Sequence, residues 1–256
     1  MEITREDLKK YENINSVSRH IRGAEDFTSE VMDYYMTGEK LNGIKLPHKE
    51  WDSKFRLRAG EISLLGGING AGKSLWASEV ILSAMNQGYK CLSISLEMSP
   101  KSQLARMWRQ ASLQVEPSME AGLQFTKWAK DKLWFYDQNG TVDPRTLMSV
   151  LRYTKDHHDV DFVLVDSLFC LSMNSDDWNG QKQVMQALAN AARHLDVHVM
   201  LVTHARKGQD IKSRLSKWDI SGSSDLTNRA DVVFLLGRVY DDPSTDAYLS
   251  LCKARH

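Results

Sequence analysis

Residues 61–74 read Glu-Ile-Ser-Leu-Leu-Gly-Gly-Ile-Asn-Gly-Ala-Gly-Lys-Ser, and this stretch decides the fold class. The apolar-rich run Ile62–Leu65 predicts a buried strand, and the G-x-x-x-x-G-K-S pattern of Gly67–Ser74 follows it and opens a predicted helix. The glycines let backbone N–H groups turn toward phosphate oxygens, and the helix N-terminus adds positive partial charge. In such a loop Lys73 reaches the β- and γ-phosphates and the Ser74 hydroxyl ligates Mg²⁺. The pattern therefore predicts nucleotide binding by Gly67, Asn69, Gly70, Ala71, Gly72, Lys73, Ser74 and Leu75.

The chain after residue 60 alternates short apolar runs with longer amphipathic segments. This alternation predicts an α/β fold with a mostly parallel sheet and helices on both faces, and it places ligands at the carboxyl ends of the strands. A final segment with period-2 alternation, residues 240–252, predicts a hairpin return. The predicted strands are 62–65, 89–95, 133–136, 160–165, 197–202 and 232–236, and the predicted helices lie near 73–87, 100–114, 144–155 and 180–195.

The first part of the chain has a different pattern. Apolar residues recur at roughly helical spacing between residues 15 and 35, and the Gly- and Pro-containing stretch 37–47 then ends the helix. We therefore divide the chain into an N-terminal arm, residues 1–47, and an α/β core, residues 48–256. The apolar face of the arm helix needs a partner, and the residues alone leave open whether that partner is the core or a neighbouring subunit.

Three predicted strands end in polar side chains. Asp166 follows directly on an apolar run that predicts a strand. An aspartate at such a strand end beside a phosphate loop holds Mg²⁺, although an aspartate after an apolar run is by itself more often a helix cap. Glu97 follows the strand after the loop's helix, so it either polarises the attacking water or only begins the next helix near Ser99. His204 follows the strand at 197–202, where it either senses the γ-phosphate or merely caps the strand.

A basic segment follows His204. Residues 206–217 contain five Lys and Arg residues, a density that suits contact with a nucleic-acid backbone and that also occurs in ordinary solvated loops. The DNA-binding candidates in this segment are Lys207, Lys212, Arg214 and Lys217.

The composition argues against several classes of protein: polyanion-coating, zinc-binding, secreted and membrane-spanning. With 33 basic and 33 acidic residues the net charge is zero, which argues against a polyanion-coating protein but not against a local basic patch. The three cysteines lie far apart, so we expect reduced thiols and no zinc site. The charged N-terminal sequence lacks a secretory apolar region, and no apolar run approaches the roughly 20 residues that span a bilayer. We therefore expect a cytoplasmic protein.

Taken in order, these motifs resemble the RecA-like core of the DnaB-family hexameric replicative helicases, over about residues 40–256. His204 makes the resemblance strongest to the phage T7-type primase-helicase and its mitochondrial relative Twinkle, since bacterial members usually carry Gln there. The stretches that carry the resemblance are Gly67–Ser74, Ser95–Ser99, Val163–Asp166, Val202–His204, Asp219–Gly222, Ala230-Asp231 and Lys253–Arg255.

The resemblance implies an ATP- and Mg²⁺-dependent ring motor, a hexamer that translocates on single-stranded DNA during replication, with a primase or polymerase as further candidate partners. It also implies a phage or phage-like source, and a phage-encoded protein would lie in the host cytoplasm. It assigns phosphate and Mg²⁺ binding to Lys73 and Ser74, the Mg²⁺ shell to Asp166, the hydrolytic base to Glu97 and γ-phosphate sensing to His204.

The resemblance also concerns the two ends of the sequence. Lys253 and Arg255 match the family's K-x-R, in which the arginine acts in trans on the ATP of a neighbour. Residues 15–36 match the linker helix, which docks on the adjacent subunit. The family normally continues after K-x-R through a Gly-rich segment into its last strands, whereas this sequence stops at His256; both a trimmed sequence and a natural minimal version stay open. Two other functions stay open: a RecA/RadA-type recombination or repair ATPase, which would form filaments, and a non-translocating regulatory P-loop ATPase.

Overall fold

The structure, a computed structural model, describes residues 23–36, 42–138, 140–168, 177–205, 214–222, 224–239 and 247–255. The chain divides into two compact units between Asn42 and Gly43. In the first unit the described elements are the 3₁₀ helix η2 (Ala24–Phe27) and the helix α3 (Thr28–Met36).

The division lies five residues before the boundary expected from the sequence at Pro47. Ile44 and Leu46 are buried in the second unit, and the backbone of Ile44 exchanges two hydrogen bonds with Leu57, at 2.8 and 3.0 Å. The segment therefore belongs to the core, because its apolar side chains are covered there. The predicted arm helix is described only from Ala24 onward, and its part before residue 23 lies outside the described residues.

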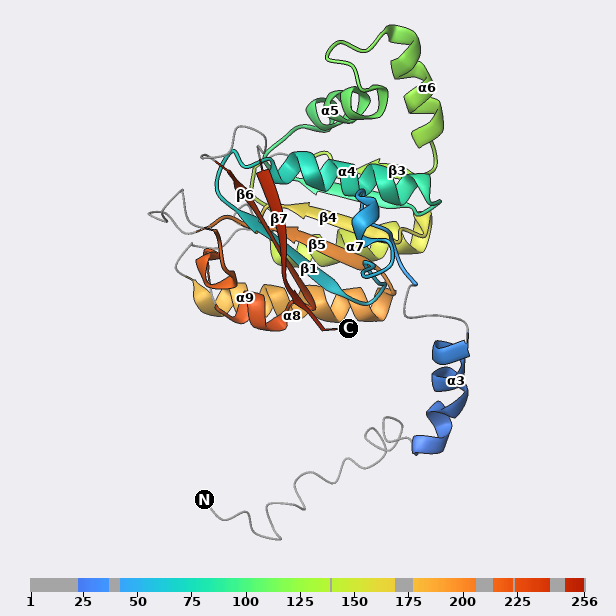
Figure 1. Cartoon of the computed structure of the whole chain (residues 1–256), viewed down its shortest axis with the longest axis vertical. Coiled ribbons are helices and arrows are strands. Elements are labelled where there is room, and N and C mark those ends of the chain that lie inside the picture. Colours follow the sequence, from blue (N-terminus) through green and yellow to red (C-terminus); the bar gives the residue numbers. More distant parts are fainter. Residues whose placement is uncertain are drawn as a thin grey trace. The chain divides into compact units, whose positions relative to one another are not determined.

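A seven-stranded sheet forms the centre of the second unit, in the order β3-β2-β4-β5-β1-β6-β7 (Figure 1). The first six strands are parallel, and β7 is antiparallel to β6. This arrangement confirms the predicted α/β fold with a mostly parallel sheet. The strands are β1 (Ile62–Gly67), β2 (Cys91–Ser95), β3 (Leu133–Phe135), β4 (Phe162–Asp166), β5 (His198–Val202), β6 (Val232–Arg238) and β7 (Ala247–Ala254).

Helices cover both faces of the sheet. One face carries α4 (Lys73–Asn86), α5 (Pro100–Ser112) and α6 (Met119–Ala129), and the other carries α7 (Pro144–His158), α8 (Trp178–Leu195) and α9 (Ser224–Arg229). Figure 1 shows α4, α5 and α6 on one side of the strands and α8 and α9 on the other. Two short 3₁₀ helices, η4 (Lys49–Trp51) and η6 (Lys217–Asp219), complete the described elements. Among the described residues no helix is long and apolar enough to cross a membrane.

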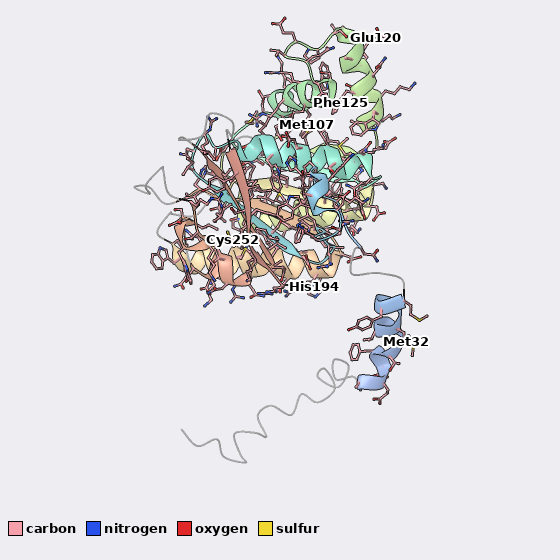
Figure 2. All side chains as sticks on the ribbon, viewed as in Figure 1. Met32, Met107, Glu120, Phe125, His194 and Cys252 are labelled. Atoms are coloured by element: carbon pink, nitrogen blue, oxygen red, sulfur yellow. The ribbon has the colours of Figure 1, made fainter. Side chains whose placement is uncertain are left out.

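Two apolar cores result from the alternation of side chains along the buried strands. In β1, Ile62 and Leu64 belong to the core under α7–α9, and Leu65 belongs to the core under α4–α6. Met107 of α5 and Phe125 of α6 are buried in the second of these cores (Figure 2). The strands that lead into the phosphate loop, Glu97, Asp166 and His204 are therefore buried along their whole length.

Side-chain caps explain where several helices begin. The Ser99 hydroxyl accepts a hydrogen bond from the Ser102 N–H at the start of α5, and Asp143 accepts one from Arg145 at the start of α7. In both helices a proline occupies the first turn, where its missing N–H costs nothing. These caps fix the residues at which α5 and α7 begin.

Candidate nucleotide-binding and catalytic site

The phosphate loop, residues Gly67–Ser74, connects the carboxyl end of β1 to the first turn of α4. Gly72 caps α4 with a φ of 99°, a left-handed conformation that disfavours any side chain with a Cβ. A Cβ at Gly67 would collide with the carbonyl oxygen of Leu236 on the neighbouring strand β6. Both glycines are thus required by local geometry, and they give the loop the turn that a phosphate-binding backbone needs.

Lys73 lies folded back across this loop. Its Nζ donates to the carbonyl oxygens of Gly67 and Ile68, both at 2.9 Å, and the residue is 7% exposed. Burial lowers the pKa of Lys73, while the nearby carboxylates of Asp166 and Glu97 oppose this shift. The ammonium group therefore lies within electrostatic reach of both acidic residues that the sequence assigns to the site.

Asp166 ends β4 and is 3% exposed. Burial raises the pKa of this carboxyl, a hydrogen bond from Ser74 lowers it, Glu97 raises it, and Lys73 and His204 lower it. Ser74 and Asp166, the two predicted Mg²⁺ ligands, are therefore in direct contact.

These two oxygens fit Mg²⁺. A buried carboxylate that lacks solvent gains from a cation, and Mg²⁺ in nucleotide sites takes one or two protein oxygens and completes its shell with phosphate oxygens and water. Among the described residues no cluster of three or more His, Cys, Asp or Glu could hold a metal by itself. Ser74 and Asp166 would therefore hold the ion together with a nucleotide.

Two polar side chains contact Glu97. Its Oε1 accepts a hydrogen bond from the Ser167 hydroxyl at 2.7 Å, and the Nε2 of His204 lies 3.5 Å from the same oxygen. The Nδ1 of His204 lies 2.6 Å from the Oδ1 of Asn69 in the phosphate loop. Side-chain contacts thus link Glu97, His204 and the phosphate loop. All three follow the carboxyl ends of strands in the same sheet.

The strand register explains why these residues meet. Leu65 of β1 pairs with Val202 of β5, and Ser95 of β2 pairs with Asp166 of β4. The carboxyl ends of four adjacent strands therefore lie level with one another, and Glu97 and His204 each follow a strand end by two residues. Ser167, which contacts Glu97, was not predicted from the sequence as a site residue. The one feature of the sequence that could have indicated it is its position next to Asp166.

Lys253 and Arg255 lie at the opposite edge of the sheet. Lys253 pairs with Val233 near the start of β6, whereas the phosphate loop follows the end of the parallel strand β1. The length of β1 separates these two edges, a distance of roughly 17 Å at 3.3 Å per residue. Neither residue is brought to the phosphate loop of its own subunit.

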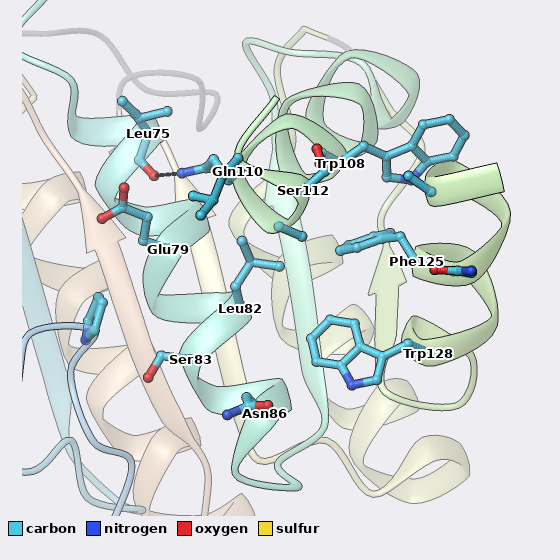
Figure 3. A pocket seen from close by; sticks show the side chains of 15 residues that line it. Leu75, Glu79, Leu82, Ser83, Asn86, Trp108, Gln110, Ser112, Phe125 and Trp128 are labelled. Atoms are coloured by element: carbon cyan, nitrogen blue, oxygen red, sulfur yellow. Dashed lines mark hydrogen bonds between the residues drawn. The ribbon is translucent and has the colours of Figure 1, made fainter. Parts of the chain in front are cut away.

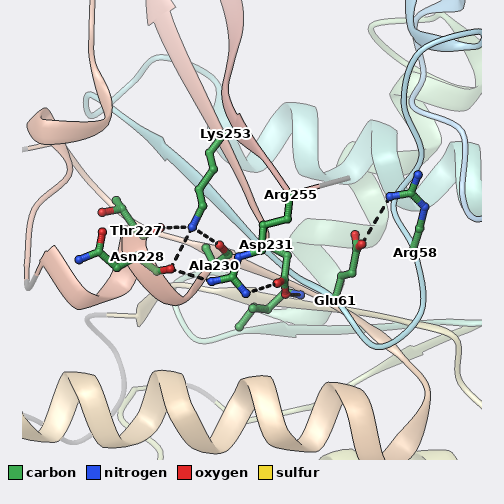
Figure 4. Close-up of polar contacts among 9 residues, drawn as sticks. Arg58, Glu61, Thr227, Asn228, Ala230, Asp231, Lys253 and Arg255 are labelled. Atoms are coloured by element: carbon green, nitrogen blue, oxygen red, sulfur yellow. Dashed lines mark hydrogen bonds and ion pairs between the residues drawn. The ribbon is translucent and has the colours of Figure 1, made fainter. Parts of the chain in front are cut away.

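Both side chains have partners at that edge (Figure 4). The Nζ of Lys253 donates to three carbonyl oxygens at the end of α9, those of Thr227, Asn228 and Ala230, at 2.7–3.0 Å. Burial lowers the pKa of Lys253, Arg255 lowers it further, and Asp231 opposes the shift. Arg255 donates from Nη1 to Asp231 at 2.8 Å and from Nη2 to the Asn228 carbonyl at 2.9 Å, and its side chain is 39% exposed.

The predicted DNA-binding segment is described only at its end. Lys207 and Lys212 lie outside the described residues. The guanidinium of Arg214 lies over the ring of Tyr248 at 5.5 Å, and the ammonium of Lys217 lies over Trp218 at 4.6 Å. The segment is anchored there to β7, because the Leu215 N–H donates to the Tyr248 hydroxyl at 2.8 Å.

Comparison with known proteins places the chain in a family. The AAA domain family matches residues 28–210. One solved structure, described as an ATPase domain, is similar with a TM-score of 0.76 and 20% sequence identity, over 92% of each chain. A second, "The Structure Of A DnaB-Like Replicative Helicase And Its Interactions With Primase", has a TM-score of 0.71 and 19% identity, over 92% of this chain and 62% of that one. The expected RecA-like fold is confirmed, and the chain belongs to the AAA domain family.

Proposed function

We propose that this protein is an ATP-dependent DNA helicase motor that translocates on single-stranded DNA as a hexameric ring during replication. The observation that carries the proposal is the meeting of Lys73, Asp166, Glu97 and His204 at one edge of a sheet whose fold is similar to helicase ATPase domains. A nucleotide site that only stores or senses ATP needs the phosphate loop, but it does not need a carboxylate poised beside it.

The residues divide the chemistry among them. Lys73 would bind the β- and γ-phosphates in place of the carbonyls of its own loop, and Ser74 and Asp166 would hold Mg²⁺. When bound, Mg²⁺ neutralises charge on the phosphate oxygens. Glu97 accepts a proton from the attacking water, a role that contributes typically 10²–10⁴-fold in rate. His204 bridges Glu97 and Asn69, so it is placed to respond when a γ-phosphate enters the loop.

The position of Arg255 supports action between subunits. Its guanidinium lies at the sheet edge opposite its own phosphate loop, and part of the side chain is exposed toward solvent. A neighbour whose phosphate loop faces this edge would receive Arg255 in trans, with Lys253 beside it. Such a finger can be worth 10³–10⁵ in rate, so hydrolysis would depend on assembly.

A groove on the α4–α6 face supports self-association (Figure 3). It has a volume of about 900 Å³, and its lining includes Leu75, Leu82, Trp108, Leu113, Phe125 and Trp128. Leu75 is 46% exposed and Leu113 is 93% exposed, an unusual amount of apolar surface for side chains of this size. An apolar groove of this kind suits contact with a partner.

We propose that α3 of a second copy occupies this groove. The apolar side chains Phe27, Val31, Met32, Tyr35 and Met36 of that unit are all exposed. The two stretches of sequence differ in charge: residues 24–36 contain Glu25, Asp26, Glu30 and Asp33 and no Lys or Arg. Residues 100–132 supply part of the groove's lining, and this stretch contains Lys101, Arg106, Arg109, Lys127, Lys130 and Lys132 against Glu116, Glu120 and Asp131. The charged residue in the lining itself is Glu79.

The assembly can be tested with charges placed on exposed side chains, where folding is not at risk. Met32→Asp on α3 and Leu113→Asp in the groove should each shift light-scattering mass from a ring toward a monomer, with a non-hydrolysable ATP analogue present. Tyr153→Asp on α7, at a side chain 56% exposed against 59% for Met32 and outside the groove, serves as the control. Rings of normal stability in both test variants would exclude α3 as the occupant.

The function itself is tested by adding single-stranded DNA. We expect DNA to stimulate ATP turnover, and we expect electron micrographs with an ATP analogue to contain closed six-fold particles. Open filaments would favour a recombination or repair ATPase. ATP turnover that DNA leaves unchanged would favour a regulatory ATPase that does not translocate.

A further inference from the structure

The two oxygens of the Glu97 carboxylate have different surroundings. The contacts that join Glu97 to the Ser167 hydroxyl, at 2.7 Å, and to the His204 Nε2, at 3.5 Å, both involve Oε1. The Glu97 side chain is 41% exposed. Oε1 is therefore the anchored oxygen, and Oε2 is the oxygen left to accept a proton from water.

Ser167 and His204, the two residues that contact Oε1 of Glu97, differ in how their own positions are determined. His204 also contacts Asn69 of the phosphate loop, so its position depends on what occupies that loop, and its charge depends on protonation. Ser167 is fully buried and directly follows the last residue of β4, so its backbone position is set by a buried strand and does not depend on the phosphate loop. A hydroxyl that donates to a carboxylate at this distance makes a strong, directional bond.

We infer that Ser167 is a positioning residue for the hydrolytic reaction: its hydroxyl holds Oε1 of Glu97 so that Oε2 points at the attacking water, whatever the state of His204. The inference rests on the proposed role of Glu97 as the base. Ser167 does not touch the nucleotide or the water in this account. It acts by keeping a flexible, part-exposed glutamate in one rotamer, and misplacing a reacting group by about 1 Å can cost on the order of 100-fold in rate.

A double-mutant cycle on the full chain tests the inference. Ser167→Ala should lower kcat for ATP roughly 10- to 100-fold, the range seen when a supporting hydrogen bond to a site residue is removed, with KM nearly unchanged. In a Glu97→Gln background the same substitution should change the residual rate less than about two-fold, because the base it positions is already gone. A merely structural role would lower both rates equally. Ser167→Thr, which keeps the hydroxyl, should recover most of the activity.

A matched control removes another buried serine hydroxyl. Ser63, near the start of β1, is fully buried and its hydroxyl lies 2.9 Å from Nε2 of His198, so Ser63→Ala should leave kcat unchanged even if it lowers the melting temperature. If Glu97→Gln abolishes turnover while Ser167→Ala stays within about two-fold of wild type, the positioning role is wrong and the proposed function stands. If Glu97→Gln itself leaves turnover intact, the base assignment fails, and the positioning role fails with it.

Discussion

A buried histidine at the start of β5 makes the stability of this protein sensitive to mild acid. His198 is completely buried, with Nδ1 2.7 Å from the carbonyl oxygen of Arg58 and Nε2 2.9 Å from the Ser63 hydroxyl. The ring of Phe162 stacks on it at 5.8 Å. A neutral ring satisfies both contacts, because Nδ1–H donates to Arg58 and Nε2 accepts from Ser63.

Burial lowers the pKa of His198 from its ordinary 6.5 to about 4, and the Arg58 carbonyl and Asp231 offset only part of this shift. Above about pH 6.5, the ordinary pKa of histidine in an unfolded chain, the His198 ring is neutral in both the folded and the unfolded protein. The residue then contributes nothing to the pH dependence of the free energy of unfolding. As the pH falls from 6.5 toward 4, the unfolded chain binds a proton that the folded chain does not, and the free energy of unfolding falls. At about 1.36 kcal/mol per pKa unit the full loss approaches about 3 kcal/mol, of which about 2 kcal/mol is lost by about pH 5.

Urea unfolding between about pH 7.5 and about pH 5 measures this loss. The variant His198→Asn keeps a donor for the Arg58 carbonyl but cannot titrate, so the wild type should lose about 2 kcal/mol more than the variant over this range. His194→Gln, at an exposed histidine of α8, should behave like the wild type. Equal losses in the wild type and His198→Asn would refute the reasoning, as would a His198 ring that titrates near 6.5 by NMR in the folded protein.

Two further predictions concern the core and the basic segment. Phe234 is fully buried, with ring centroids 5.6 Å from Phe55 and 5.3 Å from Trp76. Phe234→Ala should therefore cost about 3–5 kcal/mol in urea unfolding; a loss below about 1 kcal/mol would contradict the packing. For the basic segment, Arg214→Ala and Lys217→Ala should each lower the salt dependence of single-stranded DNA binding by a log–log slope of about 0.7 if the residue contacts a phosphate. If the salt slope and the affinity for single-stranded DNA are both unchanged, the substituted residue contacts no phosphate and belongs to a solvated surface.

The features that could be predicted from the sequence are those with short-range signals. Buried parallel strands produce uninterrupted apolar runs, and the phosphate loop is set by its own glycines, so the sheet and the loop could be predicted without knowing any distant contact. Ser99 and Asp143 mark helix starts through side chains that bond only two or three residues onward. The polar strand ends at Glu97, Asp166 and His204 followed from the rule that parallel strands share a carboxyl edge.

The features that could not be predicted depend on long-range contacts or on weak periodicity. Helix α6 buries only Gly122, Phe125 and Ala129, and its exposed surface carries Met119 and Leu123, so no clear apolar stripe stands out. The contact of Ser167 with Glu97 joins residues 70 positions apart, and local sequence contains no trace of it.

The central claim, that Glu97 is the base of a P-loop ATPase driven by single-stranded DNA, is tested most directly by one paired measurement. ATP affinity and steady-state ATP turnover, with saturating Mg²⁺ and single-stranded DNA, should be measured for the wild type and for Glu97→Gln. We predict that Glu97→Gln binds ATP within a few-fold of wild type and hydrolyses it at least about 100-fold more slowly. Turnover within a few-fold of wild type would contradict the account.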